Sequence, residues 1–283
     1  MKKALLFAVM MFYAFLTQSQ DGFQARIFKT KDGHTLPYRI LFPKNYDRTQ
    51  KYPIVVVLHG AGERGEDNVQ QLVHGSGLFL KVENRIKFRA IVIFPQCPTE
   101  SYWMSGKIRH IQHTEALEAS FDYPKEPNWP LQATIDLVRK ITKEEAADPK
   151  RVYISGMSMG GMGTFEALAR YPKLFAAAAP ICGGGNLEMT KNYAHQVPLW
   201  IFHGAVDAVI NVKYSRDIYA ALLANGAKVR YTEYPNVNHD SWDNAFAEPE
   251  FLPWMFSQIK GKTTEDDAKT IPPQTLAFQY LGH

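Results

Sequence analysis

The most informative segment of this chain is Arg151-Val152-Tyr153-Ile154-Ser155-Gly156-Met157-Ser158-Met159-Gly160. An apolar β run ends in Gly-x-Ser-x-Gly, and an amphipathic stretch at helical spacing follows from Met162 to Tyr171. A strand that turns sharply into a helix brings the two backbones together, so only very small residues fit at Gly156 and Gly160. Ser158 at the apex is then held outward at the positive end of a helix. The pattern predicts that Ser158 is a nucleophile.

The first 19 residues have the composition of a secretory signal peptide. Lys2 and Lys3 precede an apolar stretch, and Thr17-Gln18-Ser19 is a small-x-small sequence suited to signal peptidase. The apolar stretch from residue 4 to 16 is shorter than the roughly 20 residues that cross a bilayer. We therefore expect cleavage of segment 1–19, no membrane anchor, and a secreted or periplasmic protein.

The remaining 264 of the 283 residues suit one large α/β domain at 20–259 and a tail at 260–283. The formal charge falls from +4 to +2 when Lys2 and Lys3 are removed, and no basic run is present. We therefore do not expect a nucleic-acid partner. Cys97 and Cys182 each follow a different predicted strand, and we expect two free, buried thiols.

Strand and helix patterns alternate along this domain. Asp32-Gly33 separates two strand-like segments, 23–30 and 35–43, which predicts an antiparallel edge. Apolar runs rich in β-branched residues, typical of parallel strands buried on both faces, predict strands at 54–58 and 90–94. The alternation continues with predicted strands at 151–155, 175–181, 199–202 and 229–234. One expected helix runs from residue 130 until Asp148-Pro149, a second starts at 162, and a third covers 212–224. A fourth lies within 242–259 and is broken near Pro249. This order predicts an eight-stranded, mostly parallel, doubly wound sheet with helices on both faces and a site at its carboxyl edge.

The segment 96–129 departs from this rhythm, because it holds several prolines and aromatics and is too long for an ordinary connection. We expect an insertion that lies over the site. Trp103 and Trp129 in it, with Trp242, are candidate substrate-binding residues, and core packing is an equally weighted alternative.

Two histidines of the insertion, His110 and His113, lie near Glu115 and could ligate a metal. No fourth ligand with fitting spacing is visible, so we predict solvated residues there, no metal and no cofactor.

A serine nucleophile needs a base and a third group that orients the base. His239 follows the last predicted strand and precedes the last helix, so it lies in a loop at the carboxyl edge. Asp207, just past the strand at 199–202, lies in the same layer of loops and preserves the chain order of serine, acid and histidine. Asp240 and Asp243 are the alternatives. Asp240 would need a contorted loop to reach the neighbouring imidazole, and Asp243 begins a helix.

Backbone donors must face the oxygen of the tetrahedral intermediate. Met159 offers the amide just after the nucleophile, and Ala61, in His59-Gly60-Ala61-Gly62, lies in a glycine-bearing loop of the type that supplies a second amide. A plain tight turn is the alternative interpretation of that loop.

The chain resembles the α/β-hydrolase superfamily over roughly 23–259, on the motifs His59-Gly60-Ala61-Gly62-Glu63-Arg64-Gly65, Pro95-Gln96-Cys97-Pro98, Gly156-Met157-Ser158-Met159-Gly160-Gly161, His203-Gly204-Ala205-Val206-Asp207 and His239-Asp240-Ser241-Trp242. It is most similar to secreted carboxylesterases and predicted peptidases near feruloyl esterases and polyhydroxybutyrate depolymerases. The resemblance implies a triad of Ser158, Asp207 and His239, with oxyanion amides at Ala61 and Met159. In the lipase and esterase branch of this superfamily, three glycines follow the histidine of this loop. Here Ala61 stands among the residues that follow His59.

We therefore predict a secreted serine carboxylesterase that acts on a small-molecule or polysaccharide-linked ester, with acetyl or feruloyl esters of plant polysaccharides as candidate substrates. A serine peptidase of the same fold and a non-catalytic binding protein are the alternatives. The sequence makes no prediction of the oligomeric state.

Overall fold

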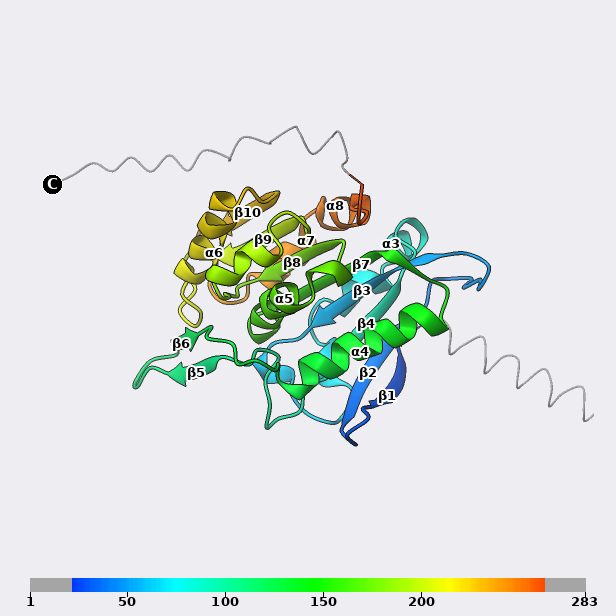
Figure 1. The fold of residues 1–283 in the computed structure, drawn as a ribbon, viewed down its shortest axis with the longest axis horizontal. Coiled ribbons are helices and arrows are strands. Elements are labelled where there is room, and N and C mark those ends of the chain that lie inside the picture. The colour runs from blue at the N-terminus through cyan, green and yellow to red at the C-terminus, as the bar shows by residue number, and fades with distance from the viewer. Residues whose placement is uncertain (1–21, 263–283) are drawn as a thin grey trace, which may run out of the picture.

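A single eight-stranded sheet forms the centre of the structure, a computed structural model that describes residues 22–262 (Figure 1). The expected signal peptide at 1–19 and the tail beyond residue 262 lie outside the described residues. The strands are β1 (Gln24–Lys29), β2 (Thr35–Leu41), β3 (Tyr52–Leu58), β4 (Ile91–Pro95), β7 (Ala147–Met157), β8 (Ala177–Ile181), β9 (Leu199–Gly204) and β10 (Val229–Tyr234). Their spatial order is β1-β2-β4-β3-β7-β8-β9-β10. β2 pairs with β1 and β4 in antiparallel register, and the other neighbours pair in parallel. The predicted sheet is confirmed.

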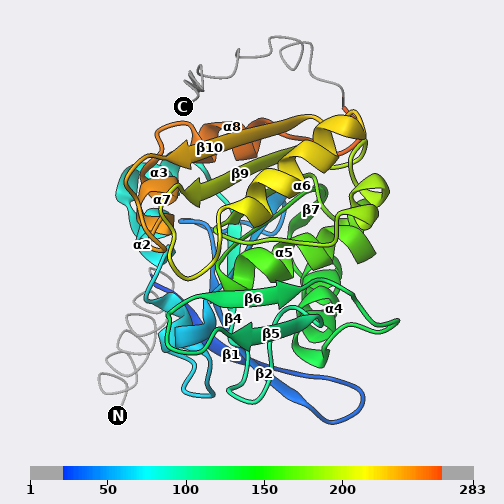
Figure 2. The ribbon, with the colours of Figure 1, turned by 90° about the vertical axis from the view of Figure 1, so that its left-hand side faces the viewer.

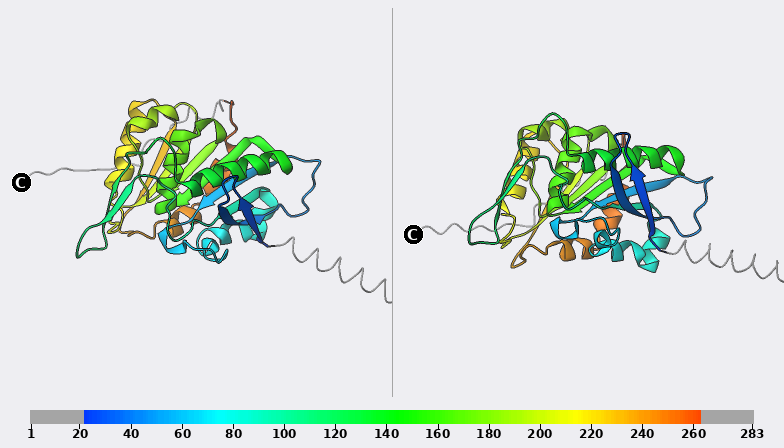
Figure 3. Two further views of the ribbon diagram at one scale, coloured as in Figure 1. Left: turned by 60° about the horizontal axis from the view of Figure 1, so that its bottom comes forward. Right: turned by 90° about the horizontal axis from the view of Figure 1, so that it is seen from below.

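Helices cover both faces of this sheet, as Figures 2 and 3 show. On one face lie α4 (Trp129–Glu144), α5 (Met159–Arg170) and α6 (Lys213–Ala224). On the other lie α2 (Ser76–Leu80), α3 (Val82–Lys87), α7 (Trp242–Ala247) and α8 (Phe251–Ser257). The last two are separate helices on either side of Pro249, where the sequence predicts a break.

The central strands are buried on both sides, as their uninterrupted apolar runs predict. In β3, Ile54, Val56 and Leu58 pack into the core beneath α4 and α5, whereas Val55 and Val57 pack into the core on the opposite face. Two hydrophobic layers therefore hold the sheet rigidly between them, and the ends of its strands become fixed points on which a site can be built.

One boundary differs from the sequence prediction. Asp148-Pro149 lies inside β7, which begins at Ala147, rather than in a break before the strand. The pairing of β7 with β3 shifts between Tyr52 and Ile54, so these residues lie in an irregular part of the ladder. A bulge of this kind accommodates a proline, which has no N–H to donate.

The insertion at 96–129 contains a hairpin that was not predicted from the sequence. β5 (Lys107–His110) and β6 (Leu117–Ser120) pair antiparallel and project beside the main sheet (Figure 2). Within residues 22–262, no helix is long and apolar enough to cross a membrane.

Candidate active site

The turn between β7 and α5 holds Ser158 in a strained conformation. Its φ is 54° and its ψ is −116°, a backbone region that costs a non-glycine residue on the order of 1–3 kcal/mol. A Cβ at Gly156 would lie 2.3 Å from the Gly160 carbonyl oxygen, and one at Gly160 would lie 2.0 Å from the Leu58 oxygen. The close approach predicted at both glycines is therefore present, and it forces the Ser158 side chain out at the edge of the sheet.

The structure brings Ser158, His239 and Asp207 together in one hydrogen-bonded chain. His239 Nε2 lies 2.9 Å from Ser158 Oγ, and its Nδ1 lies 2.8 Å from Asp207 Oδ2. Because the carboxylate can only accept, Nδ1 carries the hydrogen, and Nε2 is free to accept the serine proton. His239 comes from the loop between β10 and α7, and Asp207 from the loop after β9.

Asp207 is held as a carboxylate by four donors. Its Oδ1 accepts the backbone N–H groups of Val209 and Ile210 at 2.9 and 2.8 Å, while Oδ2 faces His239 and His203. Burial alone would raise the pKa of Asp207, but the hydrogen bonds from His203 and His239 outweigh it and hold the pKa well below its usual range. Such a group is a permanent negative charge beside the imidazole.

The two rival carboxylates do not contact His239 by any hydrogen bond that the structure records among residues 22–262. Asp240 and Asp243 are both exposed, and they are joined to each other through the N–H of Asp243 and the backbone oxygen of Asp240. Asp207, which the chain order of serine, acid and histidine predicts, is therefore the carboxylate that contacts His239.

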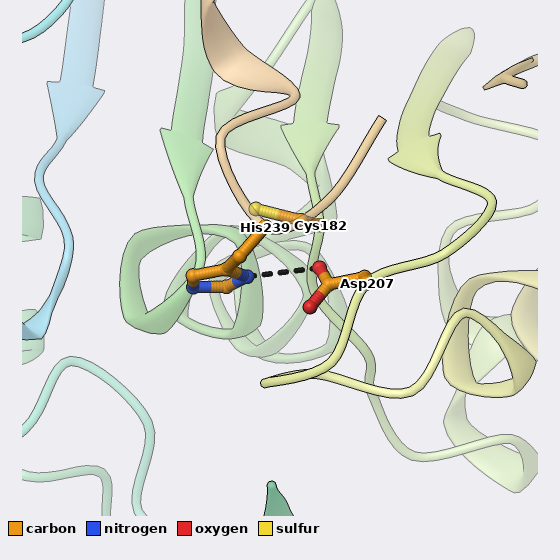
Figure 4. A group of neighbouring side chains, drawn as sticks. All are labelled: Cys182, Asp207 and His239. Carbon is orange, nitrogen blue, oxygen red and sulfur yellow. Dashed lines mark hydrogen bonds and ion pairs between the residues drawn. The ribbon is translucent and has the colours of Figure 1, made fainter. Parts of the chain in front are cut away.

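The buried thiol of Cys182 lies next to Asp207 and His239, as Figure 4 shows. Cys182 follows β8, and its sulfur lies within 4.8 Å of one ligand atom each on Asp207 and His239. Burial raises the pKa of the Cys182 thiol well above its usual range, and Asp207 and His239 are already bonded to each other. Cys182 and Cys97 are both free and buried, as predicted. Sequence reasoning did not place Cys182 at the site, although its position just after a buried strand was a usable signal.

The loop after β3 abuts the nucleophile. A Cβ at Gly60 would lie 3.8 Å from the Ser158 Cβ, so this backbone passes directly beside the serine. Ala61 begins the short helix η1 (Ala61–Glu63), and Met159 begins α5. First-turn N–H groups lack acceptors within their own helix, so both amides are of the kind that can donate to an oxyanion.

His59 and Arg64 fix the loop on either side of Ala61. His59 Nδ1 lies 2.6 Å from the Gly60 oxygen, and its Nε2 accepts the N–H of Cys97 at 2.9 Å. Burial lowers the pKa of His59 to about 4, so the ring is neutral and bonds on both sides. Arg64 donates to the oxygens of Ala61 and Thr99 at 3.0 and 2.9 Å.

Of the three candidate substrate-binding tryptophans, one adjoins the triad. Trp242 meets the ring of His239 edge to face, with centroids 5.3 Å apart. The prediction for Trp103 is wrong, because its side chain is fully buried and its indole N–H donates to the His59 oxygen at 3.1 Å. Trp129 stacks on His34 at 4.5 Å, and no recorded contact links it to the triad among the described residues.

The insertion is attached to the loop that carries the acid. Leu117 of β6 donates its N–H to the Val209 oxygen at 2.8 Å and forms a bridge with Ile210. Met104 of the insertion packs with Met162 and Ile210 in a small separate core. The exposed hairpin carries His110 and His113, which belong to no group of three potential metal ligands among residues 22–262.

Comparison with known proteins finds relatives that are named as esterases. A family model described as Phospholipase/Carboxylesterase matches residues 45–250. A bifunctional acetylxylan esterase/xylanase from Neocallimastix patriciarum is 33% identical over 129 residues, 40% of this chain and 19% of that protein. A probable carboxylesterase from Oryza sativa subsp. japonica is 24% identical over 241 residues, 78% of this chain and 93% of that one.

A solved structure of similar fold is also an esterase. The crystal structure of a thermostable esterase superposes with a TM-score of 0.76 at 37% identity, covering 85% of this chain and 64% of that one. This chain thus spans about a fifth of the acetylxylan esterase/xylanase and slightly less than two thirds of the thermostable esterase. The resemblance inferred from the sequence motifs is confirmed. Because the family model covers more than half of its length, the chain belongs to the phospholipase/carboxylesterase family of α/β-hydrolases.

Proposed function

We propose that this protein is a serine carboxylesterase that works through an acyl-enzyme intermediate. The observation that carries the proposal is the hydrogen-bonded chain from Ser158 through His239 to Asp207, with distances of 2.9 and 2.8 Å. An esterase activity is also supported by the family and by relatives that are named as esterases.

In the first half of the reaction, Ser158 Oγ attacks the ester carbonyl carbon while its proton passes to His239 Nε2. The carbonyl π bond opens onto oxygen, and the N–H groups of Ala61 and Met159 donate to the resulting oxyanion. Asp207 stabilises the imidazolium. When the tetrahedral intermediate collapses, the bond to the alcohol oxygen breaks, and His239 returns the proton to the departing alkoxide.

In the second half, water attacks the acyl-enzyme carbonyl and gives a proton to His239. Collapse of the second tetrahedral intermediate breaks the bond to Ser158 Oγ, which takes the proton back and releases the acid. Both proton transfers pass through His239, which is already in hydrogen-bond contact with Ser158 and Asp207.

Acetyl or feruloyl esters of plant polysaccharides are the proposed substrates. An acetylxylan esterase/xylanase among the relatives supports the acetyl ester, and a feruloyl esterase among them supports the feruloyl ester. Export is proposed on the basic start and apolar stretch of segment 1–19, and N-terminal sequencing of the protein recovered from the periplasm or the medium tests the cleavage.

Covalent labelling of the serine and turnover of an ester together test the proposed esterase activity. A fluorophosphonate probe should label Ser158, the Ser158→Ala variant should not be labelled, and p-nitrophenyl acetate turnover should fall by about 10⁵-fold or more in that variant. Methyl ferulate and a short chromogenic peptide serve as parallel substrates. Absence of labelling in the intact protein would indicate a binding protein, and faster cleavage of the peptide than of any ester would indicate a peptidase.

A further inference from the structure

A carboxylate lies beside the nucleophile and is not used by the reaction described above. Glu63 ends η1, and its Oε2 would lie 2.9 Å from a Cβ at Gly60, the same point that lies 3.8 Å from the Ser158 Cβ. Only 16% of the Glu63 side chain is exposed. The carboxylate therefore forms part of the wall next to the reacting serine.

Two aromatic side chains continue this wall toward the base. His74 Nε2 lies 3.8 Å from Glu63 Oε1, the His74 ring lies 5.2 Å from the Trp242 ring, and Trp242 lies 5.3 Å from the ring of His239. Glu63, His74 and Trp242 thus form a series of neighbouring side chains from the loop beside Ser158 to the ring of His239. We call these three residues the polar wall.

The polar wall is held in place by packing behind it. Gly75, next to His74, has φ of +78°, and a Cβ there would lie 2.8 Å from the ring of Phe246 in α7. The backbone that carries His74 is therefore pressed against the helix that carries Trp242. This close approach requires glycine, because a side chain would clash and its φ would be strained.

The polar wall has hydrogen-bonding capacity that the described residues do not fill. The Glu63 carboxylate has no hydrogen bond within residues 22–262, since the His74 contact of 3.8 Å is too long for one. The indole N–H of Trp242 is buried and also has no partner within that range. A nearly buried acceptor and a buried donor on one wall of an active site point to a ligand that supplies both missing partners.

The chemistry of the wall selects the kind of group that fits. A hydroxyl donates one hydrogen bond and accepts others, so it can satisfy both a carboxylate and an N–H donor. A carboxylate on the substrate would be repelled by Glu63, and an ammonium group would leave the indole donor unpaired. An uncharged hydroxyl is thus the best match to this wall.

We propose that Glu63, His74 and Trp242 form a subsite that binds a hydroxyl group of the substrate close to the scissile ester. The inference rests on the proposed esterase function and narrows its substrate class to hydroxyl-bearing esters, as in partly acylated sugars or polyols. Glu63 accepts the hydrogen bond of the hydroxyl, and the donors of His74 and Trp242 face its oxygen.

Two pairs of esters that differ by one hydroxyl test the proposal. On the alcohol side the pair is trans-2-hydroxycyclohexyl acetate and cyclohexyl acetate, and on the acyl side it is ethyl 3-hydroxybutyrate and ethyl butyrate. In at least one pair, kcat/KM should be about tenfold or more higher for the hydroxyl ester, as for a hydrogen bond to a charged acceptor. Glu63→Gln should remove most of that preference, whereas Glu66→Gln, an exposed carboxylate on the same loop, should retain it.

A charged substrate gives a second readout. Ethyl hydrogen succinate, ionised at neutral pH, should be a poor substrate, and Glu63→Gln should improve its kcat/KM several-fold because a like charge is removed. If the intact protein cleaves these esters without a preference that depends on Glu63, the hydroxyl subsite is wrong and the esterase proposal stands. If it cleaves no ester at all, the esterase proposal itself fails.

Discussion

His203 and His239 approach the same oxygen of Asp207. His203 Nε2 lies 3.2 Å from Asp207 Oδ2, and His239 Nδ1 lies 2.8 Å from that atom. His203 Nε2 also lies 2.9 Å from the Ile210 oxygen, so both groups facing this nitrogen are acceptors and it carries a hydrogen. The opposite nitrogen lies 2.7 Å from Ser215 Oγ. His203 thus acts on the base through the acid, as a positioning residue.

Replacing His203 with alanine should reduce activity and shift its pH dependence. Without this donor, the negative charge on Asp207 is less neutralised and holds the proton on His239 more tightly. We expect kcat/KM for p-nitrophenyl acetate to fall about tenfold or more, and the acidic limb of its pH profile to move to higher pH. Both are measured from pH 5 to 9.

The control for His203→Ala is Ser155→Ala, which removes another buried hydrogen bond in the sheet, from Ser155 Oγ to the Ala179 oxygen at 2.7 Å. This variant should keep the pH profile of the intact protein. If His203→Ala lowers the stability of the protein but leaves the shape of the pH profile unchanged, His203 is only a core residue.

Gly160 and Gly62 give a matched test of the sharp turn. A Cβ at Gly160 would lie 2.0 Å from the Leu58 oxygen, whereas a Cβ at Gly62 would meet nothing within 4 Å. Gly160→Ala should therefore lower the free energy of unfolding by about 3 kcal/mol or more, because backbone on both sides must move. Gly62→Ala should change it by less than about 1 kcal/mol. Urea unfolding measures both, and equal losses would contradict the steric argument.

The sequence carried enough information to predict the sheet and the chain of Ser158, His239 and Asp207. Buried parallel strands are continuous apolar runs, and their carboxyl ends lie at one edge of the sheet. Residues just past β7, β9 and β10 must therefore lie close together. Hydrophobic runs and the succession of strands and helices along the chain are local patterns, which one sequence displays directly.

The contacts that complete the site were not predictable in the same way. Trp103 and Trp242 are equally aromatic, yet one is fully buried and the other adjoins His239. Which face of a side chain meets solvent depends on packing between segments far apart in sequence, and periodicity does not encode it in an irregular insertion. Cys182 and His203 could have been proposed, because both lie at strand ends, but their partners follow from loop geometry.

His59 should make stability depend on pH. Burial lowers its pKa from 6.5 in the unfolded chain to about 4 in the fold, so the unfolded state binds more protons between these values. The contribution is fully present above pH 6.5 and is lost as pH falls toward 4, with about 2 kcal/mol lost between pH 7 and pH 5. Glutamine at this position does not titrate, so urea unfolding of His59→Gln should show a shallower fall over that range. A difference between the two proteins that stays constant with pH would refute the role of His59.

Arg170 and Glu166 on α5 hold the insertion against the helix that begins just after the nucleophile. The fully buried Glu166 carboxylate accepts the N–H of Ser105 at 2.6 Å and Arg170 Nε at 2.7 Å. Arg170 donates in turn to the oxygens of Pro124 and Lys125 at 2.6 and 2.7 Å. The side chains therefore connect both ends of the hairpin segment to α5.

Removing one partner of this pair should cost more than removing both. Arg170→Met leaves a buried carboxylate without its cation and should lower the free energy of unfolding by about 3–5 kcal/mol. The double variant Glu166→Leu/Arg170→Met removes the stranded charge and should recover a large part of that loss. Trypsin cleavage after Lys125 provides a local measurement, since this backbone loses its anchor in Arg170→Met and should be cut faster. Strictly additive unfolding energies, with unchanged cleavage at Lys125, would mean that the insertion is held by its small apolar core instead.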